Sequence, residues 1–166
     1  MIKRLIYLLA AKEHEESKGR LTVEHGALTR SDSTKKEISL VFTADEFFEG
    51  LPSIQRTLSK ENVPGSFFFT GRMYRNKKAA PMIMALEKDH HYLGAHSDQH
   101  LLYADWTERD STLVTRDSLL RDLRSCHASM EAIGVRDGKR LFIPPYEWWN
   151  RRIADWCHAE GVQLIN

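Results

Sequence analysis

Two acids and two histidines are the side chains whose types and spacing could support hydrolytic chemistry. Asp45 and Glu46 are adjacent and follow an apolar run, where a carboxylate is costly to bury unless a cation or hydrogen-bond donors receive it. His96 and His100 are four residues apart, so both imidazoles can point the same way and bind one transition metal. Solvated surface acids and a histidine-rich surface loop are the competing interpretations of these patterns.

The chain around these residues alternates short β-branched or aromatic runs with longer stretches of helical period. We expect strands at residues 38–43, 66–70, 91–95, 140–143 and 162–165, and helices at 52–60, 79–89, 116–133 and 151–160. Thr115 and Asn150 are the expected N-caps of the last two helices. This order predicts a parallel sheet with right-handed crossovers, either open or closed into a barrel. In both folds function gathers at the carboxyl ends of the strands, so the acid pair and the histidine pair should lie at the same edge.

Length and composition indicate one globular domain. The chain has 166 residues, of which 42% are hydrophobic and 28% charged. Its 24 Lys and Arg residues nearly balance 23 Asp and Glu residues, and a net charge of +1 gives no field for binding nucleic acid. Two cysteines are too few for a disulfide framework, and no apolar run approaches the length of about 18 residues that spans a bilayer.

The two ends of the chain carry separate signals. Residues 1–26 form an N-terminal segment before a domain at 27–166, and Lys3 and Arg4 precede an apolar run at 5–11 that resembles a minimal signal peptide. A first strand or helix is the alternative, so the compartment stays open, with a lean to an extracytoplasmic one. Ser31-Asp32-Ser33-Thr34 lies between apolar runs at 27–29 and 38–43, which predicts a hairpin. The chain stops on an apolar strand with nothing to cover it, which indicates a domain truncated at its C-terminus.

Three segments that follow the expected strands are Thr43-Ala44-Asp45-Glu46, His96-Ser97-Asp98-Gln99-His100 and Phe142-Ile143-Pro144-Pro145-Tyr146-Glu147. They resemble, in order, the Thr-Phe-Asp-Asp, His-Ser/Thr-x-x-His and Phe-Arg-Pro-Pro-Tyr-Gly motifs of the polysaccharide deacetylase family, the NodB-homology domain of carbohydrate esterase family four. The resemblance runs from about residue 38 to residue 166. It implies an α/β fold, an incomplete (β/α) barrel with about five of its parallel strands present.

The resemblance also implies a function and a set of roles. The function is metal-dependent removal of acetyl groups from N-acetylated or O-acetylated sugars, with a carbohydrate substrate and a divalent metal, zinc being the ion expected. Asp45 is implied as the catalytic base, and Glu46, His96 and His100 as metal ligands. The backbone N–H of Tyr146 is implied to hold the oxyanion, and this residue lies in the expected substrate-binding group Pro145, Tyr146 and Trp148.

Three departures from the family pattern affect these expectations. Glu46 replaces an Asp and adds one methylene, and Ile143 stands where the family has an Arg that pairs with the base. The family's later motifs, which include the general-acid histidine, should follow Asn166. We therefore expect this chain to bind metal but to deacetylate weakly or not at all.

Two other functions compete with this one. The first is a glycan-binding module with degenerate chemistry, which the residue at position 143 favours. The second is a phosphoesterase of the barrel type, for which Arg72 is the nearby basic group. Trp148, Trp149 and Tyr74 could form a platform for sugar rings, although packing in the core is the alternative for the two tryptophans.

Overall fold

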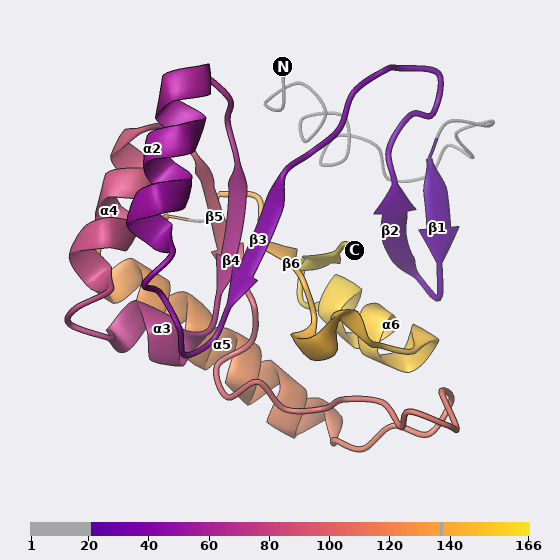
Figure 1. Cartoon of the computed structure of the whole chain (residues 1–166). Coiled ribbons are helices and arrows are strands. Elements are labelled where there is room, and N and C mark those ends of the chain that lie inside the picture. Colours follow the sequence, from indigo (N-terminus) through magenta and orange to yellow (C-terminus); the bar gives the residue numbers. More distant parts are fainter. Residues whose placement is uncertain (1–20, 137) are drawn as a thin grey trace.

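The computed structural model describes residues 21–136 and 138–166 (Figure 1). The signal-like run predicted at residues 5–11 lies outside these ranges. Five parallel strands form one sheet in the order β3-β4-β5-β6-β7. Their bounds are Val41–Ala44 for β3, Ser66–Phe69 for β4, Tyr92–Ala95 for β5, Leu141–Phe142 for β6 and Gln163–Leu164 for β7. The five strands and their parallel order are those predicted from the sequence, and the sheet is an incomplete barrel.

Five α-helices connect or follow these strands: α2 (Leu51–Glu61), α3 (Gly71–Arg75), α4 (Ala80–Lys88), α5 (Arg116–Ala132) and α6 (Arg151–Ala159). All but α3 were predicted to within one residue at each end. The expected caps are present, since Thr115 and Asn150 accept hydrogen bonds from the amides of Ser118 and Ile153. Helix α3 was missed because five residues are too few to establish a helical period. None of the described helices is long and apolar enough to cross a membrane.

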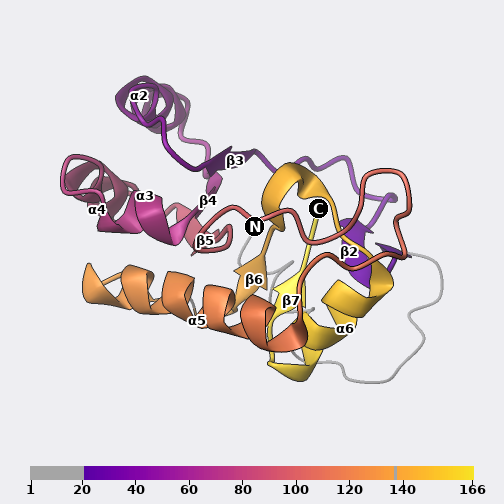
Figure 2. The same ribbon diagram turned by 90° about the horizontal axis from the view of Figure 1, so that it is seen from below.

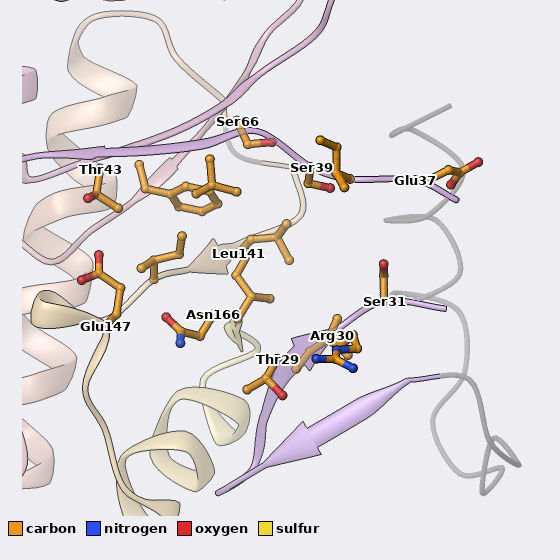
Figure 3. A pocket seen from close by; sticks show the side chains of 16 residues that line it. Thr29, Arg30, Ser31, Glu37, Ser39, Thr43, Ser66, Leu141, Glu147 and Asn166 are labelled. Carbon is orange, nitrogen blue, oxygen red and sulfur yellow. The ribbon is translucent and has the colours of Figure 1, made fainter. Parts of the chain in front are cut away.

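The two faces of the sheet have different environments. The helices pack on the outer face, where Phe67 and Phe69 of β4 join the main core with side chains from all five helices, α2 to α6 (Figures 1 and 2). On the inner face, Phe68 packs with Leu141 and Ile143 in a smaller cluster. This inner face borders an open pocket of about 630 Å³ (Figure 3). Side chains on both faces explain why β4 is buried along its whole length, as expected of a parallel strand.

The predicted hairpin between residues 27–29 and 38–43 is wrong. Strand β2 (Ala27–Arg30) instead pairs antiparallel with β1 (Thr22–Glu24), and Leu28 bridges Ile165 beyond β7. The two-residue connection of β1 and β2 is His25-Gly26, both with positive φ, which is the geometry of a tight hairpin turn. Asp32 does form the expected local turn, since its carboxylate accepts hydrogen bonds from the amide and hydroxyl of Thr34. The strands on either side of this turn, β2 and β3, do not pair with each other.

Candidate functional site

The predicted chemical residues lie at the carboxyl ends of three parallel strands. Asp45 and Glu46 follow β3, His96 follows β5, and Tyr146 lies in a short 3-10 helix, η1 (Pro145–Glu147), just after β6. Because the strands are parallel, these ends share one edge of the sheet. The inner-face pocket is lined by other residues, so the candidate site lies at this edge and not in that pocket.

The histidines form a close pair. The Nε2 atoms of His96 and His100 are 3.2 Å apart, and Nδ1 of His96 lies 2.9 Å from the carbonyl oxygen of Ile143. Since a carbonyl only accepts, Nδ1 carries the proton and Nε2 keeps a lone pair directed at His100. Burial lowers the pKa of His96 to about 4, so its imidazole is neutral at neutral pH. A neutral imidazole nitrogen is the form that binds a metal.

The loop between the histidines is held by a buried carboxylate of α5. Asp122 accepts hydrogen bonds from the amides of Asp98 and Gln99 at 2.9 and 3.0 Å and from the hydroxyl of Tyr103 at 2.8 Å. The same loop has positive φ at Ser97 and at His100. Such backbone conformations cost free energy and persist only when surrounding contacts enforce them. Asp122 supplies two such contacts and so holds the backbone that joins the two histidines.

The acid pair meets an arginine from α3. Arg72 donates to both carboxylate oxygens of Asp45, and its Nη1 lies 3.4 Å from Oε1 of Glu46. Thr70, at the N-cap of α3, donates a further hydrogen bond of 2.9 Å to Asp45. Asp45 therefore has the cationic partner that the residue at position 143 does not supply. The side chain of Ile143 is buried with Phe68 and Leu141 on the inner face.

The donor set at this edge fits a transition metal in part. The two imidazoles converge as two ligands of one ion would. Glu46 lies with Arg72, its side chain 61% exposed, and in the described part of the chain no three His, Cys, Asp or Glu side chains are grouped to hold a metal. The two histidines are placed as two ligands of one ion require, and the roles predicted for Asp45, Glu46, His96 and His100 all stay predictions.

The aromatic residues divide between core and surface. Tyr74 and Trp149 are buried, and the hydroxyl of Tyr74 donates to the carbonyl of Gly94, so neither can serve in the suggested sugar platform. Trp148 is half-buried, with the guanidinium of Arg109 3.6 Å above its ring. Tyr146 has a φ of 62° and is 46% exposed, and its ring lies 4.6 Å from that of His100. Pro145, which precedes it in the chain, is buried.

Sequence reasoning missed several residues of this site. Asp122 has a signal in the sequence, since it is a charged residue on the apolar face that Leu119 and Cys126 define on the same helix. Arg72 was weighed only as a phosphate-binding group, because its contact with Asp45 depends on the unpredicted helix α3. The sequence gives no signal for Trp106, because its loop has no periodic pattern.

The candidate site residues lie at the carboxyl ends of the strands of an incomplete parallel barrel, which is the arrangement of a carbohydrate esterase fold. The family model for polysaccharide deacetylase matches residues 30–165, and the chain belongs to that family. A curated relative, an uncharacterized 30.6 kDa protein of Geobacillus stearothermophilus, is 28% identical over 158 residues. That alignment covers 94% of this chain and 54% of the relative, so the chain spans about half of that relative's length.

Solved structures share the fold. A family 4 carbohydrate esterase from Bacillus anthracis superposes with a TM-score of 0.73 at 21% identity, covering 86% of this chain and 64% of the other. A mutant of a Bacillus anthracis pseudoenzyme of the same family, with restored enzymatic activity, superposes with a TM-score of 0.72 at 21% identity, covering 87% and 49%. Both likenesses concern the fold, and the second shows that the fold also occurs in a pseudoenzyme.

Proposed function

We propose that the domain predicted at residues 27–166 is a metal-dependent deacetylase that removes acetyl groups from N-acetylated or O-acetylated saccharides. The observation that carries the proposal is the pair of imidazole Nε2 atoms, 3.2 Å apart, at the same sheet edge as the Asp45 carboxylate. Membership in the polysaccharide deacetylase family supports the class of reaction.

His96 and His100 would hold the metal, with Glu46 as the third ligand after release from Arg72. A bound divalent cation, zinc by the chemistry of the imidazoles, lowers the pKa of water and polarises the acetyl carbonyl. Asp45 would accept the proton of the attacking water and return it to the departing amine or alcohol, and Arg72 and Thr70 fix the direction of its carboxylate. The backbone N–H of Tyr146 would donate to the developing oxyanion, and Trp148 would border the bound sugar. Pro145, predicted in the same substrate-binding group, is buried and would act only by shaping the backbone at Tyr146.

A second candidate is a glycan-binding module without turnover. The observation that favours it is the position of Glu46, which lies with Arg72 and not with the two histidines. On this alternative the saccharide binds at the same edge, and replacing Asp45 leaves binding unchanged.

Metal analysis of the purified chain tests the metal site. We expect about one zinc ion per wild-type chain and loss of that ion in a His96→Ala, His100→Ala double variant. The control is His158→Ala, which changes an exposed histidine on α6 and should keep the metal. Equal zinc content in all three proteins would show that His96 and His100 do not bind zinc.

Acetate release from acetylated oligosaccharides separates the two candidates. We expect only weak turnover from this chain, so acetate release is followed at high protein concentration. A deacetylase shows this weak turnover and loses it in Asp45→Asn while it still binds saccharide, whereas a binding module has no turnover in either protein.

A further inference from the structure

A strip of aromatic rings extends away from the histidine pair. It consists of Tyr146, Trp106 and Trp148, and we call these three residues the aromatic strip. Tyr146 lies against His100, Trp106 lies 5.6 Å from Tyr146, and Trp148 lies 5.5 Å from Trp106, all measured between ring centroids. Trp106 comes from the long loop between β5 and α5, which runs past the segment between β6 and α6 (Figure 2). The strip begins at His100, one of the two candidate metal ligands.

The loop holds Trp106 in a defined position. The carboxylate of Asp105 accepts hydrogen bonds from the amides of Thr107 and Glu108, both at 2.9 Å, and from the hydroxyl of Thr107 at 2.8 Å. The carbonyl of Asp105 accepts from Nε1 of Trp148 at 3.0 Å, which ties the loop to the strip. Because the residues on both sides of Trp106 are held by hydrogen bonds, its loop loses little conformational entropy when a ligand binds.

The strip is exposed although it is held in place. Trp106 is 54% exposed and Tyr146 is 46% exposed, while Trp148 is covered on one side by Arg109. Two exposed rings offer much less area than the roughly 800 Å² per partner of a stable protein interface. They do match a ligand the size of one sugar ring, whose apolar face can stack on aromatic carbon while its hydroxyls stay in water. The size of the exposed surface therefore favours a saccharide over a protein partner.

We propose that Trp106, together with Tyr146, forms a subsite for the sugar unit next to the one that is deacetylated. This inference rests on the proposed function, because it needs a saccharide at the histidine pair. It assigns Trp106 as a specificity-determining residue, and the chain should prefer oligosaccharides to single acetylated sugars.

Calorimetric titration measures this preference without requiring turnover. The probes are N-acetylglucosamine, its tetramer and an acetylated xylo-oligosaccharide. We expect the wild-type chain to bind one of the oligomers at least about tenfold more tightly than a single sugar, and Trp106→Ala to lose this advantage. Trp106→Phe should restore most of it, because the phenyl ring can still stack.

Leu113→Ala is the matched control, since Leu113 is a 50% exposed side chain of the same loop outside the strip. It should bind like the wild type, and both alanine variants should melt near the wild-type temperature. Oligosaccharide affinity that is unchanged in Trp106→Ala would overturn the subsite and leave the proposed function standing. A wild-type chain that binds zinc but none of the saccharides would overturn both the subsite and the carbohydrate substrate.

Discussion

Asp45, the proposed catalytic base, illustrates how a carboxylate can keep its orientation when one expected partner is missing. The resemblance to polysaccharide deacetylases implies an arginine at position 143, where this chain has isoleucine. In the structure Arg72 approaches from α3 and contacts both oxygens of Asp45 in the two-pronged manner that suits a guanidinium. The positive charge beside Asp45 therefore comes from Arg72, after β4, and not from position 143, after β6. The carboxylate still has a guanidinium partner.

Arg72→Gln should lower turnover much more than stability. A displaced general base costs about 10²-fold in rate, whereas a pair whose arginine side chain is 40% exposed contributes at most about 1 kcal/mol to folding. Acetate release by the zinc-loaded chain and urea unfolding measure the two effects. We expect kcat to fall with little change in KM.

The control for this variant is Arg124→Gln, which breaks a comparable arginine–carboxylate pair with Glu160 on the surface. It should leave turnover unchanged. Wild-type kcat in Arg72→Gln would show that Asp45 does not depend on Arg72 for its orientation.

At the scale of elements, the sequence predicts what periodicity encodes and misses what depends on single contacts. Apolar spacing gives α2, α4, α5 and α6 to within one residue and gives the five strands in order. The hairpin of β1 and β2 was missed because β1 has only three residues, too few for a clear alternating pattern. The bridge from Leu28 to Ile165 could not be predicted, because it joins residues far apart in the chain. Likewise, the direction of Glu46 depends on Arg72, which an unpredicted helix presents.

Asp122 couples a helix to the histidine loop, and its removal should be costly. Asp122→Ala leaves the amides of Asp98 and Gln99 and the hydroxyl of Tyr103 without their acceptor in a buried position. We expect a loss of at least about 2 kcal/mol in the free energy of unfolding. Urea titration of the metal-free chain measures it.

Asp117→Ala on the same helix is the matched control, because Asp117 is exposed and should change stability by no more than about 0.5 kcal/mol. Asp122→Asn should fall between the two, since an amide oxygen can still accept. An Asp122→Ala chain as stable as the Asp117→Ala chain would contradict the holding role assigned to this carboxylate.

For the whole molecule, the sheet has one well-packed face and one that borders the open pocket. The outer core contains side chains from five helices, whereas the inner cluster is small. The ends of the strands that carry the chemistry are thus supported mainly from outside. Conditions that weaken contacts at the outer face should lower the stability of the whole sheet, and His91 is one group there that responds to pH.

His91 is buried just before β5, where its Nδ1 accepts a hydrogen bond of 3.0 Å from the amide of Gly65 and its ring packs edge-on against Phe67. Burial lowers the pKa of His91 in the folded chain, and the charge of Asp89 opposes this only in part. The unfolded chain, with a histidine pKa of about 6.5, therefore binds a proton at a higher pH than the folded chain does. The free energy of unfolding should consequently fall as the pH drops below about 6.5.

In His91→Asn, which keeps an acceptor but cannot be protonated, urea unfolding at pH 7.5 and 5.5 should show a smaller loss of stability than in the wild type. The exposed control His158→Asn should keep the wild-type loss, and an equal loss in all three proteins would mean that protonation of His91 does not contribute to the pH dependence of folding.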